Sequence, residues 1–344
     1  MLPPIDPTAI RAALRHPIVE ACLLACLAIT IHLAGNGRTS LWDRDEPRYA
    51  QCTREMQASG DWIRPTFNGE PRHHKPVLIY WLMMAGYAIG GDNPFGARLV
   101  SAVMGTGTVL LTWGLGRKMF GPSAGRLAGL ILASAPIVII EAKLATTDAT
   151  LACILVAAQS LLWRLSRRDS PGSAMGFWAL MAAALLIKGP VGPLLIACAG
   201  AASWWWGGPT ACWKRLRWRQ GLALMVALAL PWYAAIGILT RGEFFRLAVG
   251  TQIVGRVVTG LEEHGAPPGY YVATTLVGFY LVVGDPADRP VRGLEAAAEP
   301  ARPGLPAGLD GRALAGARMR QDQADPLLPA RPARLRPARL VDDP

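Results

Sequence analysis

The stretch LWDRDEPRYAQ, residues 41 to 51, places five charged side chains within six positions of a chain that is otherwise mostly apolar. These are Asp43, Arg44, Asp45, Glu46 and Arg48. Charge beside sequence of membrane-grade hydrophobicity is costly unless the charged groups are paired or have a function. We therefore interpret the stretch as part of a polar loop that follows the first apolar run, and derive the fold from the apolar runs around it.

The composition is typical of an integral membrane protein, because 52% of the 344 residues are hydrophobic and 17% are charged. The net charge of +11 comes from arginines and lysines in short clusters between apolar runs. This arrangement indicates membrane topology and argues against nucleic acid as a partner. The six cysteines are scattered, without the spacing of zinc ligands or of redox motifs, so we interpret them as packing residues.

Eight apolar runs reach about the length that crosses a bilayer. The first lacks a convincing signal-peptide cleavage site and is expected to be a transmembrane helix. A ninth run, 76–91, is shorter, follows a proline and ends in Gly-Gly, which favours a re-entrant or interfacial helix. The eight runs are 18–35, 98–116, 123–141, 149–165, 174–188, 190–206, 220–239 and 270–283. The sequence therefore predicts an all-α fold, a polytopic transmembrane helix bundle with amphipathic helices in its first outer loop, 36–97.

The positive-inside rule orients this bundle. If 76–91 does not cross, all the basic clusters fall on one side of the membrane, and otherwise the N-terminal arginines oppose the later clusters. The clusters are Arg11 with Arg15, Arg117-Lys118 with Arg126, the RLSRR loop at 164–168, and WKRLRWR at 213–219. The outer side then receives the loop 36–97, the turn Lys143 to Asp148, the turn Lys188 to Pro190, and the polar loop 240–269.

Composition changes sharply after Val283. The last 61 residues contain no aromatic residue and no Ile, Lys, Ser, Thr, Asn, Cys or His, and consist largely of Arg, Ala, Pro, Gly, Leu and Asp. This bias is typical of a disordered tail and equally of a GC-rich gene read out of frame. We expect a transmembrane domain over 1–283 and a disordered or frameshift-derived tail over 284–344.

The charged stretch is expected to begin a helix. The residue before a proline avoids helical dihedrals whereas proline suits the first helical position, so the helix should run from Pro47 to Ser59 and stop at Gly60. Tyr49, Thr53 and Met56 would then share one face. Asp45 lies just outside the helix start. It could be a helix cap or a solvated charge, but Arg48, the triplet His73-His74-Lys75 and Asp148 are expected on the same side of the membrane.

The run DEPRYAQCTREMQASGDWIRPTFNGEPRHHKPVLIYW, from Asp45 to Trp81, resembles the signature loop of the GT-C membrane glycosyltransferases, of the aminoarabinose transferase and protein O-mannosyltransferase type. Their pattern is roughly D-E-x-R-Y-A, S-G-D-W, N-G and K-P-P-L-x-Y-W. Further resemblance lies at LATTDATLA, at the KGP turn and at TQIVGRVVTGLEEHGAPPGYY. The resemblance covers roughly residues 18 to 283. The sequence departs from the pattern at Val77, which replaces the second proline, and at His74, where many relatives carry an acidic residue.

This resemblance implies that a sugar moves from a polyisoprenyl-phosphate donor to lipid A, another glycan or a protein, at the outer face of a bacterial inner membrane. Asp45 would be the catalytic carboxylate and Asp148 the second acidic position. A carboxylate can take the acceptor's proton while positive charge develops on the anomeric carbon, and cations such as Arg48 and Lys75 can stabilise the departing phosphate. The full set expected at the substrates is Glu46, Arg48, Tyr49, Lys75 and Arg256.

Other candidates rest on weaker patterns. His74 and His264, with His73, could hold a divalent ion, although adjacent histidines are usually not ligands. No other cofactor is expected. Lys188 could face the donor phosphate, but extending its ammonium to the membrane surface from a helix end is the preferred interpretation. The loop residues Glu262 and Glu263 are equally compatible with solvent.

There are two alternatives to an active transferase. A transporter should place ionisable residues in the middle of its spans and show an inverted repeat. Nearly all strong charges here lie at span ends, and no internal repeat is apparent. The other alternative is an inactive remnant of a transferase, because relatives continue with further spans whereas here the eighth run is interrupted near Val283.

Overall fold

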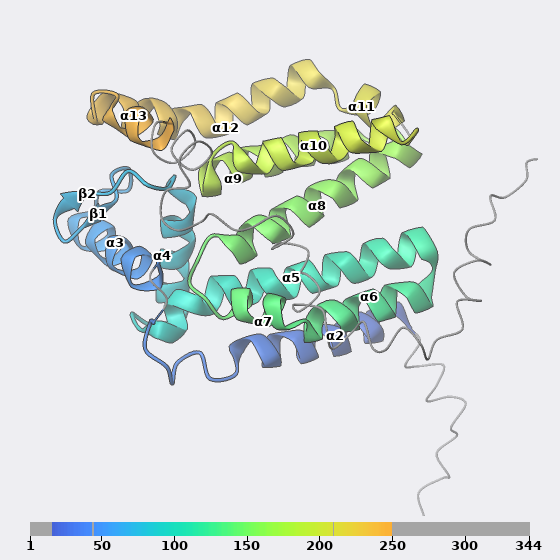
Figure 1. The fold of residues 1–344 in the computed structure, drawn as a ribbon, viewed down its shortest axis with the longest axis horizontal. Helices are drawn as coiled ribbons and strands as arrows, with labels where there is room; N and C mark the ends of the chain where they lie inside the picture. The colour runs from blue at the N-terminus through green and yellow to red at the C-terminus, as the bar shows by residue number, and fades with distance from the viewer. Residues whose placement is uncertain (1–15, 43–44, 209, 250–344) are drawn as a thin grey trace, which may run out of the picture. The chain divides into compact units, whose positions relative to one another are not determined.

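The structure, a computed structural model, describes residues 16–42, 45–208 and 210–249. Within these ranges the chain is almost entirely helical (Figure 1). The elements are α2 (Pro17–Leu33), α3 (Glu46–Ser59), β1 (Thr66–Phe67), β2 (Glu70–Pro71), α4 (Leu78–Gly90), α5 (Pro94–Phe120), α6 (Pro122–Ser134), α7 (Pro136–Ala142), α8 (Asp148–Arg167), α9 (Pro171–Lys188), α10 (Val191–Trp205), α11 (Ala211–Arg215), α12 (Trp218–Leu239) and α13 (Glu243–Val249). The predicted span 270–283 lies outside the described residues.

Four of the described helices, α5, α8, α9 and α12, are long and apolar enough to cross a membrane. The pair α6 and α7 makes a fifth span if it is counted as one. The predicted all-α transmembrane bundle is therefore confirmed, and the chain is an integral membrane protein. The apolar helices α2, α4 and α10 are shorter, with 17, 13 and 15 residues.

The expected span 123–141 is broken into two helices. Helix α6 ends at Ser134 and α7 begins at Pro136, with a bend of 62° between them. Proline has no N–H to donate, and its ring clashes with the preceding turn, so a helix cannot continue smoothly through it. Prolines also begin α2, α5 and α9, where the missing N–H has no helical partner in any case.

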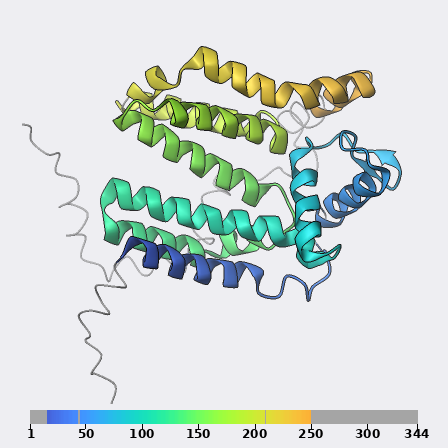
Figure 2. The ribbon, with the colours of Figure 1, turned by 180° about the vertical axis from the view of Figure 1, so that it is seen from behind.

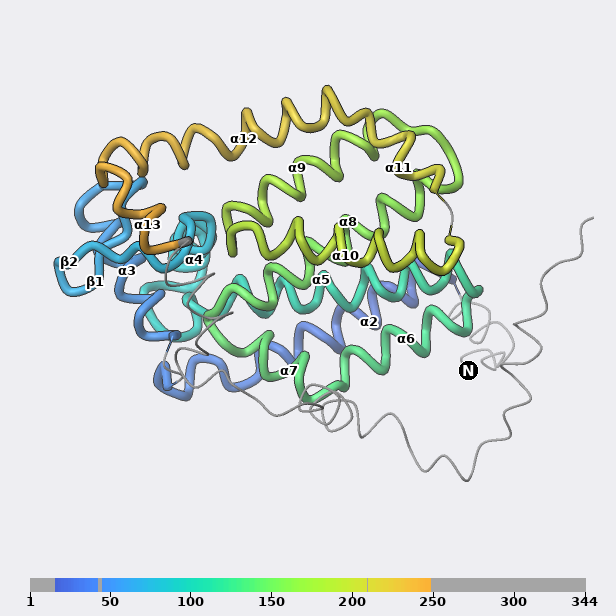
Figure 3. Tube along the Cα trace, turned by 45° about the horizontal axis from the view of Figure 1, so that its top comes forward, coloured from blue at the N-terminus to red at the C-terminus, as the bar shows by residue number. Residues whose placement is uncertain are grey.

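The helices pack as neighbours in two connected groups. Helices α2 and α6 lie against α5, as Figures 1 and 2 both show. Helix α8 packs on α5 and on α9, and α12 lies along α9 (Figure 3). Trp178 of α9 secures this last contact, because its indole Nε1 donates to Leu216 O at 2.8 Å and its ring lies against Gly221 of α12.

The loop that follows α2 forms a compact layer at one end of the bundle, where α3, α4 and the β1–β2 hairpin lie together (Figure 1). Helix α3 begins one residue earlier than expected, at Glu46, and stops at Gly60, which has φ of 68°. Tyr49, Thr53 and Met56 are buried, as their shared face predicts. Two indoles hold the segment after α3: Trp81 Nε1 donates to Trp62 O at 2.9 Å and Trp232 Nε1 to Ile63 O at 3.1 Å.

Candidate active site

Asp45 lies at the start of α3, and its carboxylate is not used as a helix cap. It occupies the N-cap position, but its side chain makes no capping hydrogen bond. The side chain is 48% exposed, and its Oδ1 lies 3.5 Å from Arg48 Nη1 and 3.9 Å from Arg72 Nη2. Two guanidinium groups therefore flank a carboxylate that solvent and a ligand can reach.

Arg72 is a residue that the sequence pattern did not single out. It directly follows β2, and its backbone N–H donates to Pro65 O at 2.9 Å. Its guanidinium lies over the ring of Tyr49 at 5.7 Å and over that of Phe67 at 5.8 Å. The residue is 9% exposed. Two aromatic faces thus hold a largely buried cation beside Asp45, and its place directly before the histidine pair is the only sequence signal for it.

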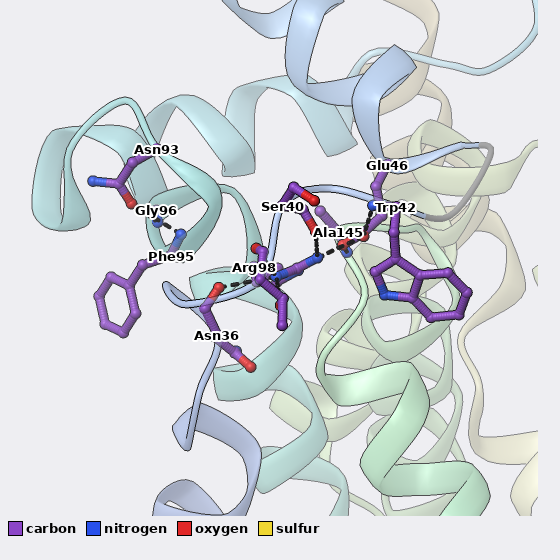
Figure 4. A network of polar contacts seen from close by, with 10 residues as sticks. Asn36, Ser40, Trp42, Glu46, Asn93, Phe95, Gly96, Arg98 and Ala145 are labelled. Carbon is purple, nitrogen blue, oxygen red and sulfur yellow. Dashed lines mark hydrogen bonds and ion pairs between the residues drawn. The ribbon is translucent and has the colours of Figure 1, made fainter.

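Glu46 departs from the expectation that it binds substrate. Its side chain is 0% exposed, and its two oxygens accept hydrogen bonds from Arg98 Nε and Nη2, each at 2.8 Å (Figure 4). The backbone N–H groups of Ala145 and Trp42 donate to the same carboxylate at 2.8 and 3.3 Å. Burial acts to raise the pKa of Glu46, but the bonds from Arg98 and Ala145 prevail and lower it. Glu46 is therefore an ionised structural anchor.

Arg98 extends this anchor to the loop before α3. Besides Glu46, its guanidinium donates to Asn36 O at 2.9 Å, to Thr39 O at 3.0 Å and to Ser40 O at 2.9 Å (Figure 4). Helix α5 is held in place at this point by Asn93, whose side chain accepts from the N–H groups of the first turn. One buried cation therefore fixes both the loop that leads to Asp45 and, through Glu46 and Ala145, the turn that leads to Asp148.

Asp148 is the first residue of α8 and forms an ion pair with Lys188, the last residue of α9. Its side chain is 47% exposed. Burial and the neighbouring Tyr80 raise the pKa of Tyr49, and the negative charges of Asp45 and Asp148 add to the rise against the opposing charge of Arg72. Both carboxylates therefore lie within electrostatic range of the same phenol.

The remaining expected substrate residues divide into two groups. Tyr49 is 1% exposed and packs on Tyr80, with ring centroids 6.0 Å apart. It therefore lies away from the surface, and its ring contacts the guanidinium of Arg72. Arg48 and Lys75 are half-buried and can contact a ligand. Arg256 lies outside the described residues.

The two adjacent histidines have different environments. His73 is 6% exposed and lies edge-on to Phe244, with ring centroids 6.1 Å apart, and burial lowers its pKa. His74 is exposed. Over the described ranges, no group of three or more His, Cys, Asp or Glu side chains could hold a metal ion. His264 lies outside these ranges, so the metal site stays a prediction.

Comparison with known proteins places this geometry in context. Residues 74–234 match the family described as dolichyl-phosphate-mannose-protein mannosyltransferase. The undecaprenyl phosphate-alpha-4-amino-4-deoxy-L-arabinose arabinosyl transferase 1 of Pseudomonas fluorescens (strain Pf0-1) is 30% identical over 245 residues, 67% of this chain and 41% of that protein. The corresponding transferase of Pseudomonas aeruginosa (strain PAO1) is 28% identical over 269 residues, 74% of this chain and 47% of that protein.

The fold is also similar to a solved structure, that of ArnT from Cupriavidus metallidurans bound to undecaprenyl phosphate. The TM-score is 0.65 and the sequence identity 25%, over 75% of this chain and 48% of that protein. The chain thus spans less than half the length of the relatives it matches. Because sequence similarity and helical arrangement agree over this region, the chain belongs to the GT-C membrane glycosyltransferases of the aminoarabinose transferase type.

Proposed function

We propose that this protein transfers a sugar from a polyisoprenyl-phosphate donor to an acceptor at the outer face of the membrane, with Asp45 as the catalytic carboxylate. The observation that carries the proposal is the state of Asp45 itself. Its side chain is half exposed, caps no helix and lies against Arg48 and Arg72. A carboxylate that merely capped α3 would bond to backbone N–H groups of the first turn.

In the proposed reaction, an acceptor oxygen attacks the anomeric carbon of the donor while the bond from that carbon to the phosphate oxygen breaks. Asp45 takes the proton from the acceptor hydroxyl as the new glycosidic bond forms. The bonding pair leaves with the phosphate, whose added charge Arg48 and Lys75 stabilise. Arg72, held by two rings, positions the carboxylate. An acid catalyst is not required, because phosphate is already a good leaving group.

Asp148 is the second acidic residue of the proposal. Its ion pair with Lys188 brings together the start of α8 and the end of α9. Lys188 also lies at a helix C-terminus, where a cation is stabilised by the helix dipole. We assign Asp148 to orienting the acceptor and Lys188 to the donor phosphate. Arg256 and a metal ion bound by His74 and His264 remain expectations for the loop beyond the described residues.

The substrates follow from the relatives. The similar curated proteins are named for undecaprenyl-phosphate aminoarabinose, and the similar solved structure holds undecaprenyl phosphate. These names favour an aminoarabinose donor, and of the acceptors that the sequence implies we propose lipid A. The distribution of arginine and lysine clusters, together with bacterial relatives, supports a bacterial inner membrane with the site on its periplasmic face.

The test is transfer from labelled undecaprenyl-phosphate aminoarabinose to lipid A by membranes that contain the chain. Asp45→Asn should lower transfer at least about a hundredfold, because a positioned acid or base typically contributes 10² to 10⁴ in rate. Asp92→Asn is the matched control, since Asp92 is an exposed carboxylate of the same outer layer that pairs with Arg54 at 2.6 Å. Full activity of Asp45→Asn would remove Asp45 from catalysis, and a wild-type chain that transfers no sugar would refute the proposed activity.

A further inference from the structure

A second site candidate is a groove lined by residues of α5 and α8. Its charged residues come from the ends of these helices that lie away from α3, and Figure 1 shows these two helix ends at the other end of the bundle. Along α5, the rise per residue puts Lys118, which lines the groove, about 30 Å from Arg98 beside the Asp45 loop. The groove encloses about 840 Å³ of space not filled by atoms, part of it open. It is therefore separate from the proposed transfer site.

One wall of the groove is apolar. It is lined by Leu110, Leu111 and Leu115 of α5 and by Leu161 of α8. Between them lies Gly114, where an added Cβ would meet no atom within 4 Å. The groove thus has an apolar lining between two helices that are long and apolar enough to cross a membrane, and hydrocarbon covers such a lining better than water does.

The mouth of the groove is strongly basic. Lys118, Arg164, Arg167 and Arg168 all line it, and all four are exposed. None of them forms an ion pair within the described part of the chain. Arg167 lies over the ring of Trp163 at 5.6 Å, which fixes one of the four at the rim.

Other cations at this end of the bundle do form ion pairs. Arg117 and Arg126 both bind the buried Glu20, at 2.8 and 3.3 Å. Asp169 follows Arg168 in sequence, yet it pairs with Arg217 at 3.4 Å. The acidic residue that adjoins the cluster in sequence is thus paired elsewhere, and the four cations line one opening without an ion pair to the described residues.

We propose that this groove binds an anionic glycerophospholipid of the inner leaflet, with the phosphate among the four cations and one acyl chain along the leucine wall. Charge complementarity selects the headgroup, since basic pockets between helices on this side of a membrane attract anionic lipids. The apolar wall selects a lipid over a free phosphate or a nucleotide, because a soluble anion would leave the leucines uncovered. The site is independent of the sugar transfer proposed above.

The test uses the full chain in phosphatidylcholine nanodiscs, to which phosphatidylglycerol with brominated acyl chains is added. Bromine quenches nearby indoles, and Trp163 lines the groove, so a saturable quenching that is lost in Trp163→Phe reports occupancy. The double change Arg167→Gln with Arg168→Gln should weaken the apparent affinity about tenfold or more, given the attraction of each basic residue to an anionic surface. Gly114→Leu should block the acyl channel while all the charges remain.

Two controls decide the outcome. Lys214→Gln with Arg219→Gln removes the same charge from exposed positions at the same end of the bundle, and it should leave the quenching unchanged. Equal quenching by brominated phosphatidylcholine, an equal loss in this control pair, or full binding by Gly114→Leu would each overturn the proposal. So would displacement of the brominated lipid by free inorganic phosphate at equal concentration. Because the Gly114→Leu variant keeps every cation, it distinguishes a seated lipid from a diffuse surface charge.

Discussion

Arg98 and Glu46 form a fully buried ion pair in which one guanidinium binds both oxygens of one carboxylate at 2.8 Å. Removing one member leaves the other as an uncompensated buried charge. We expect Glu46→Gln to lower the free energy of unfolding by about 3 kcal/mol, measured by thermal melting in detergent. Arg98→Lys should also destabilise, because a lysine cannot replace the fork of donors. Unchanged melting in both variants would contradict the anchoring role of the pair.

The same pair makes stability depend on pH. The pKa of Glu46 is lowered in the folded state, so its contribution is complete above the ordinary carboxyl pKa of about 4.3 and is lost as the pH falls through the lower folded value. The gap in melting temperature between wild type and Glu46→Gln should therefore be constant from neutral pH to about pH 5 and narrow below about pH 4. If the difference in melting temperature instead widened as the pH falls, the pKa of Glu46 would not be lowered by folding, and its role as an ionised anchor would be refuted.

Asp148 and Lys188 belong to one ion pair, so their substitution separates a structural from a functional role. Asp148→Asn and Lys188→Gln break the same half-buried contact, and each should cost about 1 kcal/mol in stability. If the roles proposed above hold, Asp148→Asn lowers kcat, whereas Lys188→Gln chiefly raises KM for the donor. Identical kinetic effects of the two changes would instead indicate that only the ion pair matters.

In the proposed mechanism Arg72 positions Asp45, and Arg72→Lys tests this role. The lysine keeps the positive charge but loses the planar group that stacks on Tyr49 and Phe67. We expect kcat of sugar transfer to fall by about tenfold with little change in KM, a loss that corresponds to about 1.4 kcal/mol in the barrier. Wild-type kcat in this variant would show that charge alone is sufficient.

The close contact between α12 and α9 requires a glycine at position 221. A Cβ at this position would lie 1.8 Å from Trp178 Cδ1. Gly221→Ala should therefore displace the indole, break its bond to Leu216 and destabilise by about 1 to 3 kcal/mol. Gly172→Ala is the control, because a Cβ there meets nothing within 4 Å and alanine favours a helix. Equal melting of the two variants would contradict the packing argument.

Much of the fold could be predicted from local sequence. Pro47 and Gly60 bracket α3 to within one residue, and the spacing of Tyr49, Thr53 and Met56 gives its buried face. The break before Pro136 differs from the prediction, because the length of the apolar run alone indicates one span. A proline in the middle of an apolar run is the signal that could have shown it.

The site was harder to predict because partners distant in sequence define it. Asp45 and Glu46 are adjacent carboxylates that the sequence does not distinguish. Only Glu46 is buried, in an ion pair with Arg98, which lies 52 positions after it. An arginine at the start of an apolar run was the available signal, since charge at membrane depth requires a partner. Arg72 differs, because its role depends on the two rings on either side of it, and no periodicity in the sequence brings those rings together.

The bend between α6 and α7 shortens the rise of the chain toward the turn before Asp148. With α6 along the membrane normal, its 13 residues rise about 20 Å, and the seven residues of α7, tilted by 62°, add only about 5 Å. A hydrocarbon core is about 30 Å thick. The bent pair, which rises about 25 Å, therefore falls short of that thickness, so the chain turns toward Asp148 earlier than it would after a straight helix of the same length.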